Sequence, residues 1–191
     1  MYRARLGKNL EKVTLDYVSS IDNDIEIANY DILGSQAHAI MLYENKIIAK
    51  NEIKKILKGL ESLKKTKFAK KTDSEDIHEL IESLVIKKIG IDAGGKMHTA
   101  RSRNDQVALD IRMKIRDDIN IVCQCLLDTI KALVVLAKKH QDTIIPLYTH
   151  LQQAQVGLFS HYLLSYADAL FRDLDRPVSY THLTLPTILL V

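Results

Sequence analysis

This sequence has few cysteines, little excess of one charge over the other, and no long hydrophobic run. The chain of 191 residues has two cysteines, Cys123 and Cys125, which lie two apart in a helical pattern and so point to different faces. This spacing excludes a disulfide framework and a zinc site built from cysteine pairs, and a reducing compartment is the default. The formal net charge of +3 is too small to indicate a nucleic-acid partner.

Export and membrane signals are missing as well. The segment Met1–Lys8 has no apolar region of a secretory signal. No stretch reaches the ~18 consecutive apolar residues that a membrane-spanning helix needs. We therefore expect a cytoplasmic protein that does not contact a membrane. Eight lysines fall between Lys54 and Lys71, but they alternate with apolar residues at helical spacing. That pattern is typical of the solvated face of an amphipathic helix.

Helical periodicity dominates what is present, and no segment shows the strict alternation of a half-buried strand. One apolar stripe begins at Ile25 and runs through Ala39 towards Leu42. A second follows Asn51, which we expect to cap its helix, and a third follows Ser74. The second and third stripes consist of Ile53, Ile56, Leu57, Leu60 and Leu63, and of Ile77, Leu80, Ile81, Leu84 and Val85. The pattern predicts an all-α protein.

The longest predicted helix runs from about Ser102 to Lys139. Its apolar residues recur every three or four positions: Ile111, Ile115, Ile119, Val122, Leu126, Ile130, Leu133 and Ala137. At 1.5 Å per residue this helix is roughly 55 Å long, a length typical of coiled coils and extended bundles. Pro146 ends the pattern, and Tyr148–Gln155 is expected to form a polar turn before a second helix, whose apolar face starts at Leu158. The apolar faces of two such antiparallel helices need further partners.

Two apparent ligand sites do not hold. Gly90–Lys96 has the spacing of a phosphate-binding loop, but Met97 stands where that loop requires a hydroxyl for magnesium. The histidines are scattered, without the close pair or the cysteine partners of a zinc site. We therefore expect no metal site and no nucleotide.

The richest polar segment is Gly94–Gln106, which leads into the long helix. Its glycine pair is expected to free the backbone before two arginines, a histidine, an amide and two hydroxyl residues. Ser102 with Asp105 is typical of a capping box, which places Arg103 and Asn104 in the first helical turn. Unpaired N–H groups and the helix dipole favour an anion there, and a guanidinium suits a carboxylate. The alternative is an ordinary capped helix with a solvated start.

His150 is the second candidate for chemistry. It lies in the polar segment after Pro146, between Thr149 and several glutamines. A solvated imidazole titrates near neutral pH and can act as a general acid or base. His161, inside the following helix, is interpreted as a structural or surface residue.

Two of these segments resemble the signature regions of the argininosuccinate lyases. Lys96–Gln106 is similar to the first, and Tyr148–Gln155, followed by His161–Ala167, is similar to the second. Weaker matches are Ser20–Asp24 and Asp73–His78. The family belongs to the fumarase and aspartase superfamily of helical homotetramers, whose central domain is a long five-helix bundle. The resemblance implies that the predicted long helices are the start of that bundle.

The resemblance also implies an activity and a set of site residues. The activity is the β-elimination of argininosuccinate to arginine and fumarate, the last step of arginine biosynthesis, with no metal or cofactor. His150 would be the catalytic histidine. The residues that would contact the substrate are Ser20, Arg103, Asn104 and Thr149. Those that would support the site are Asp24, His78, Thr99 and Ser102. Family sites combine segments from three subunits of a homotetramer, so the expected partners are a small-molecule substrate and further copies of the chain.

The character of the sequence changes at Arg176. From Pro177 to Val191 the only side chain that can carry a charge near neutral pH is His182, and helical periodicity stops. We interpret residues 177–191 as a foreign tail on an N-terminal fragment of the family. The expected domains are an N-terminal helical domain at 1–101, the start of the bundle at 102–176, and this tail. Because the family's serine-bearing third signature is absent, such a fragment is expected to react poorly alone.

Two other functions stay open at this point. One is another lyase of the superfamily, such as adenylosuccinate lyase, although the arginine-rich run Thr99–Asp105 argues against it. The other is a non-catalytic structural protein, as the lens delta crystallins exemplify for this fold. The intact Thr149 and His150 favour the enzyme.

Overall fold

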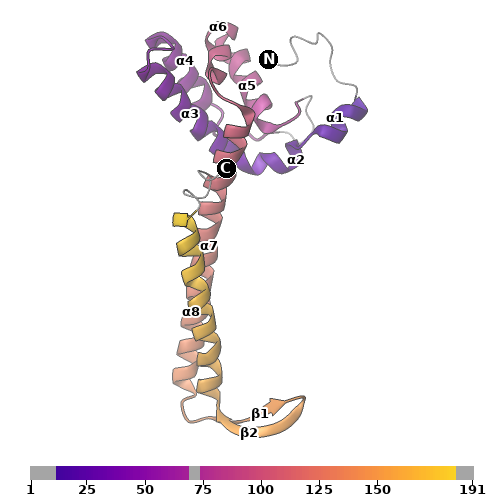
Figure 1. Cartoon of the computed structure of the whole chain (residues 1–191), viewed down its shortest axis with the longest axis vertical. Helices are drawn as coiled ribbons and strands as arrows, with labels where there is room; N and C mark the ends of the chain where they lie inside the picture. The colour runs from indigo at the N-terminus through magenta and orange to yellow at the C-terminus, as the bar shows by residue number, and fades with distance from the viewer. Residues whose placement is uncertain (1–11, 69–73, 184–191) are drawn as a thin grey trace. The chain divides into compact units, whose positions relative to one another are not determined.

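The computed structural model of the chain describes residues 12–68 and 74–183, whose regular structure is helical apart from one hairpin (Figure 1). In chain order the elements are α1 (Lys12–Val18), α2 (Ile21–Asp24), the 3₁₀ helix η2 (Ile25–Ile27), α3 (Ala28–Glu44), α4 (Lys50–Glu61), α5 (Ile77–Ile89), α6 (Ile91–Gly94), the 3₁₀ helix η3 (Gly95–His98), α7 (Arg103–Lys139), β1 (Ile144–Thr149), β2 (Gln152–Leu158) and α8 (Phe159–Leu183). The chain divides into two compact units, Met1–Lys114 and Ile115–Val191, and α7 contributes residues to both. The predicted all-α fold class is confirmed, with the hairpin as its exception.

The core of the first unit lies among α3, α4 and α5, each of which packs against the other two. The predicted apolar stripes supply its buried side chains, among them Ile32, Leu42, Ile56, Leu60, Ile81 and Val85. Burying one aliphatic side chain of this size contributes about 1.5–3 kcal/mol. The three stripes read from the sequence therefore hold this unit together.

The caps of α4 and α5 correct one prediction. α4 begins after Ala49, whose backbone N–H donates to Oε2 of Glu52 at 2.7 Å, so Asn51 lies inside the first turn and is not the cap. α5 begins after Asp76, whose Oδ1 accepts the backbone N–H of Glu79 at 2.6 Å. A carboxylate at this position satisfies one unpaired N–H and lies at the positive end of the helix dipole.

The glycine pair before α7 has a packing role and not the conformational one expected from the sequence. Gly94 and Gly95 both have ordinary right-handed helical angles, with φ of −65° and −64°. A Cβ on Gly94 would lie 2.9 Å from the Cα of Ile86. Glycine is needed at position 94 because the backbone of α6 approaches that of α5 more closely than a side chain allows.

The start of α7 confirms the predicted capping box. The Oγ of Ser102 accepts the backbone N–H of Asn104 at 3.2 Å, and Oδ2 of Asp105 accepts the backbone N–H of Ser102 at 2.8 Å. Arg103 and Asn104 are therefore in the first turn, as predicted. The helix has 37 residues, which corresponds to roughly 55 Å.

The segment after α7 is a β-hairpin, so the expectation of a polar turn without strands is wrong. β1 pairs antiparallel with β2, with an irregularity between Leu147 and Tyr148. Most side chains of both strands are exposed. A strand that buries neither face needs no alternating apolar pattern, which is why the sequence did not indicate it. Leu158, expected at the start of the second helix, is the last residue of β2.

In the second unit α8 runs back along α7 (Figure 1), where Ala137, Leu163 and Ala167 are buried. The backbone of α8 stays helical beyond Arg176, to Leu183, although the periodicity of the sequence stops at Arg176. The origin of residues 177–191 and the domain boundaries expected from the sequence stay predictions.

Part of the apolar stripe of α7 is uncovered within this chain. Ile111, Ile115 and Val122 are exposed by 43%, 49% and 53%. One 18-residue window of α7 has a mean hydropathy of 1.8, so by length and composition this helix could cross a membrane. The sequence expectation overlooked this window because Asp128 and Lys131 interrupt the run of apolar residues. The inner helix of a bundle has the same composition, since it too is surrounded by apolar groups.

The close packing at Gly94 leads to a stability prediction. Gly94→Ala should lower the free energy of unfolding by about 1–3 kcal/mol, because the new methyl group collides with backbone atoms of Ile86. Gly59→Ala is the matched control, since its Cβ would meet only side-chain atoms of Ile89 and Val85, at 3.3 and 3.4 Å. Alanine also has the higher helix propensity there. Urea denaturation measures both changes, and equal losses would contradict the proposed packing.

Candidate functional site

Arg103 is anchored on two sides at the start of α7. Its Nε lies 3.1 Å from Oδ2 of Asp76, and its Nη1 donates to Oε1 of Gln106 at 3.1 Å. Neither contact uses Nη2, and the side chain is 33% exposed. A guanidinium fixed through two of its nitrogens can present the third to a carboxylate with little loss of side-chain entropy.

Asp76, which the sequence analysis did not single out, contacts the candidate residue Arg103. One of its oxygens caps α5, and the other pairs with Arg103. The N-terminus of α5 and the first turn of α7 are thus joined through one carboxylate. The available signal was an aspartate directly before an apolar helical stripe, which predicts a cap but not its second partner.

Ser20 and Asp24 lie against the same end of α5. The backbone N–H of Ser20 donates to the carbonyl of Glu75 at 3.0 Å, and its Oγ donates to Oδ2 of Asp24 at 2.6 Å. Glu75 directly precedes Asp76, the partner of Arg103. The first unit therefore brings together four predicted residues around this short segment: Ser20, Asp24, Ser102 and Arg103. The exposed side chain of Asn104 lies on the same turn as Arg103.

Beneath Arg103 lies a group of buried polar side chains, Asp31, His78, Gln106 and Asp110, called here the buried cluster. Each is at most 4% exposed. Nδ1 of His78 lies 2.9 Å from Oδ1 of Asp31 and 3.5 Å from Oδ2 of Asp110. Nε2 of Gln106 donates to Oδ1 of Asp31 at 2.7 Å. The predicted supporting residue His78 thus joins α3, α5 and α7, through partners that the sequence analysis missed.

The two carboxyls of the buried cluster titrate differently. Burial raises the pKa of Asp110, and the negative charge of Asp31 raises it further, to about 7. Burial also acts to raise the pKa of Asp31, but the hydrogen bonds of His78 and Gln106 and the charges of His78 and Arg101 outweigh it and lower that pKa. Two like charges at this depth repel strongly, so one carboxyl keeps its proton near neutral pH.

Asp31, His78 and Asp110 offer one ligand atom each, all within 4.8 Å of one another. This spacing could suit a divalent cation. However, Oδ1 of Asp31 already accepts hydrogen bonds, and the Arg101 guanidinium supplies positive charge to both carboxyls. A cation would have to displace a proton and face that guanidinium at short range. We therefore assign these residues to a hydrogen-bonded cluster and not to a metal site.

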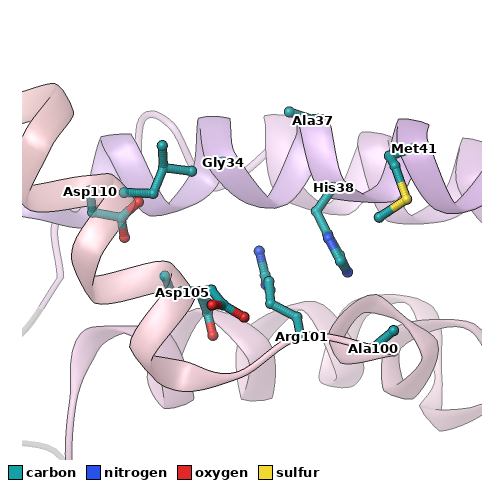
Figure 2. Close-up of a pocket in the computed structure, with 10 residues that line it drawn as sticks. Gly34, Ala37, His38, Met41, Ala100, Arg101, Asp105 and Asp110 are labelled. Atoms are coloured by element: carbon teal, nitrogen blue, oxygen red, sulfur yellow. The ribbon is translucent and has the colours of Figure 1, made fainter. Parts of the chain in front are cut away.

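A cavity of about 440 Å³ lies between α3 and the start of α7 (Figure 2). It is lined by Gly34, Ala37, His38, Met41, Ala100, Arg101, Asp105, Gln106, Leu109 and Asp110. Figure 2 shows His38 and Arg101 pointing into the same space. Nε2 of His38 donates to the carbonyl of Thr99 at 2.9 Å, and Nη2 of Arg101 donates to Oγ of Ser35 at 3.1 Å. The predicted supporting residue Thr99 thus contacts His38 through its backbone carbonyl.

The remaining predicted residues, Thr149 and His150, lie in the hairpin of the second unit. Thr149 pairs with Gln152, so His150 and Leu151 are the two central residues of the turn. Both have left-handed backbone angles, with φ of 46° and 63°. Two-residue hairpins favour Asn-Gly at these positions, and other residues adopt such angles at a cost of roughly 1 kcal/mol or more each. Strained backbone positions are often found at functional sites. The exposed side chain of His150 is therefore a candidate for a functional role.

Comparison with known proteins shows which family the chain belongs to. A family model described as a lyase matches residues 5–187. The chain belongs to this lyase family. An argininosuccinate lyase of Nitrosopumilus maritimus (strain SCM1) is 70% identical over 176 residues, which is 92% of this chain and 36% of that protein. One from Methanocaldococcus jannaschii is 45% identical over 177 residues, 91% of this chain and 37% of that protein.

Solved structures of a lyase and of a cycloisomerase have a similar fold. An EDDS lyase variant with bound fumarate has a TM-score of 0.70 and 29% identity, covering 86% of this chain and 32% of that one. A β-carboxy-cis,cis-muconate cycloisomerase from Acinetobacter calcoaceticus, with a TM-score of 0.71 and 18% identity over 90% of this chain and 41% of its own, shows the fold alone. The chain spans about a third of the length of the curated relatives it matches.

The double role of Asp76 can be separated by two substitutions. Asp76→Ala removes both the cap and the ion pair and should lower the free energy of unfolding by about 1–2 kcal/mol. Asp76→Asn keeps a good capping side chain but loses the charge that faces Arg103, which is partly exposed. The free energy of unfolding of Asp76→Asn should therefore fall by less than about 1 kcal/mol. Chemical denaturation at neutral pH distinguishes them, and equal losses would mean that Asp76 does not act as a cap.

Proposed function

We propose that this lyase is an argininosuccinate lyase, which cleaves argininosuccinate into arginine and fumarate in the last step of arginine biosynthesis. The observation that carries the proposal is the 70% identity to the Nitrosopumilus maritimus argininosuccinate lyase over 92% of this chain. An alignment of 176 residues is too long to leave out either of the two signature segments of this chain. The identity therefore includes both Lys96–Gln106 and Tyr148–Gln155. The fumarate bound to the structurally similar EDDS lyase variant supports a dicarboxylate product.

Arg103 and Asn104 fit the anionic part of this substrate. Removing a proton from the carbon next to a carboxylate leaves a dianionic aci-carboxylate, whose charge must be stabilised as it develops. Nη2 of Arg103, the Asn104 amide and the positive end of α7 are donors suited to that charge. Asp76 and Gln106 fix the guanidinium in advance, which lowers the cost of reorganising it during the reaction.

His150 fits the other half of the reaction. When the bond between carbon and the guanidinium nitrogen breaks, the electron pair left by the departing proton becomes the double bond of fumarate. The leaving nitrogen takes a proton, which an exposed imidazole at the tip of a hairpin can donate. Thr149, directly before it, is proposed to contact the substrate. These steps require no metal or redox cofactor.

The assembly is proposed to be a cytoplasmic homotetramer with active sites shared between subunits. Support comes from the uncovered apolar residues on α7 and α8, which in a bundle would face helices of other copies. A shared site would also explain why the segments with Arg103 and His150 are placed on different units of the chain. Ser20 and Asp24 are proposed to complete the substrate side at Arg103.

The proposed activity can be tested in a chain completed to full length. We suggest joining residues 1–176 to the remainder of the Nitrosopumilus maritimus relative and following fumarate release from argininosuccinate by absorbance. His150→Asn should lower kcat by about 10²–10⁴-fold with little change in substrate binding, because the amide keeps hydrogen bonding but does not titrate. His161→Asn, an exposed histidine on α8, is the matched control and should stay near normal.

Arg103→Lys should behave differently in the same assay. The charge remains but the fork is lost, so KM should rise and kcat should fall together. Near-normal kcat in both the His150 and Arg103 variants would exclude these residues from the site. Cleavage of adenylosuccinate but not argininosuccinate would assign the chain to the alternative lyase. No turnover of either would favour a structural protein.

The proposed assembly predicts that this chain self-associates through α7. Ile115→Lys with Val122→Lys places charges on the exposed part of the stripe and should shift the chain towards monomer in sedimentation velocity. Ile91→Lys is the control, since Ile91 is 59% exposed on α6 and belongs to no such stripe. A stable monomer for the unchanged chain would contradict the bundle interface.

A further inference from the structure

Gln106 connects the buried cluster to Arg103. Gln106 accepts from Nη1 of Arg103 through Oε1 and donates to Oδ1 of Asp31 through Nε2. The amide thus has one end at the partly exposed guanidinium and the other in the core. The amide oxygen can only accept and the amide nitrogen can only donate. The negative charge of Asp31 on one side and the positive charge of Arg103 on the other therefore fix the orientation of the amide.

Asp110 lies one helical turn after Gln106 on the same face of α7. Its Oδ2 and the Oδ2 of Asp31 are both fully buried, and neither has a hydrogen-bond partner of acceptable geometry among the described residues. One oxygen of each carboxyl nevertheless lies within 4.8 Å of the other. A hydrogen bond between Asp31 and Asp110 is among the causes that raise the pKa of Asp110. A single proton held between the carboxyls satisfies both atoms and removes one of two like charges.

We infer that Asp31, Gln106 and Asp110 are positioning residues for Arg103. The proton shared by the two carboxyls fastens the first turns of α7 to α3 and α5, and the Gln106 amide transmits that order to the guanidinium. This inference rests on the proposed function for the role of Arg103, but not for the existence of the shared proton. The shared proton makes the packing of the first turns of α7 against α3 and α5, called here docking, depend on pH.

The charges that face Asp110 come from each element around it. Asp31 on α3 disfavours its ionised form, and His78 on α5 and Arg101 in the loop before α7 favour that form. Arg101 in turn faces Glu82. Burial and Asp31 outweigh the influence of His78 and Arg101. Undocked α7 would carry an exposed carboxyl, which loses its proton near pH 4. The docked state keeps the proton up to about pH 7. Docking therefore weakens as pH rises towards 7 and changes little above it.

Hydrogen exchange of the full 191-residue chain measures this docking directly. Mass spectrometry of peptides covering Arg103–Asp110 gives their protection, after correction for the intrinsic pH dependence of exchange. Between about pH 5.5 and pH 7.5 we expect protection to fall by about tenfold or more. A profile that stays flat over this range would overturn the inference, and this arm needs no variant to fold.

Asp110→Asn tests the source of the effect, since the amide can donate to Asp31 without titrating. Its protection should vary less than about twofold over the same range and exceed that of the unchanged chain at the upper pH. Asp92→Asn, an exposed carboxylate on α6, should follow the unchanged chain. A fall in Asp110→Asn equal to that of the unchanged chain would overturn the shared proton. A rise in protection on adding zinc or magnesium chloride alone would replace it by a metal site.

The link to Arg103 is tested in the completed chain. Gln106→Leu should lower kcat/KM about tenfold or more, because a displaced guanidinium no longer meets the carboxylate, while retaining its helical circular dichroism. Normal kcat/KM in this variant would overturn the positioning role. If the completed chain with native Gln106 has no lyase activity, the proposed function fails, and the exchange experiment still decides on the shared proton.

Discussion

The hydrogen bonds of the Gln106 amide are the interaction on which the rest of the site depends. On one side they determine where Arg103 stands, and on the other they require Asp31 to be an ionised acceptor in the core. Burying a carboxylate is costly unless it is paired and hydrogen-bonded. The buried cluster meets that condition with partners from α3, α5 and α7. The helices of the first unit thus have two tasks, to bury apolar stripes and to satisfy one charge.

A polar cluster of this kind favours one arrangement over others with equal apolar burial. Aliphatic side chains tolerate small shifts of a helix along its neighbour, whereas hydrogen bonds of 2.7–2.9 Å do not. α7 continues far beyond this anchor, and Ile111, Ile115 and Val122 of its stripe are exposed in the chain. The register of its first turn is therefore set by the first unit, while the remainder is left for other contacts.

The regular helices could be predicted because their signals are local. Stripes at helical spacing gave α3, α4, α5 and α7, and the Ser102–Asp105 box gave the start of α7. Arg103, Asn104 and His150 were found by motif, and the structure places them at a helix start and a hairpin tip. The hairpin was missed because its strands bury neither face. Asp31 and Asp110 were missed because the sequence does not distinguish a buried aspartate from a solvent-exposed one. Only partners that are distant in the sequence show that these two aspartates are buried.

Arg103 and His150 are held in position in different ways. At Arg103 the chain fixes a side chain by surrounding it with partners, at the cost of burying charge beneath it. At His150 it fixes the backbone instead, since a two-residue turn with two left-handed residues leaves little freedom at its tip. The first device suits a group that must hold a developing charge with little reorganisation. The second suits a group that must remain solvated enough to exchange protons. The division of labour proposed for the reaction thus follows from how each residue is held.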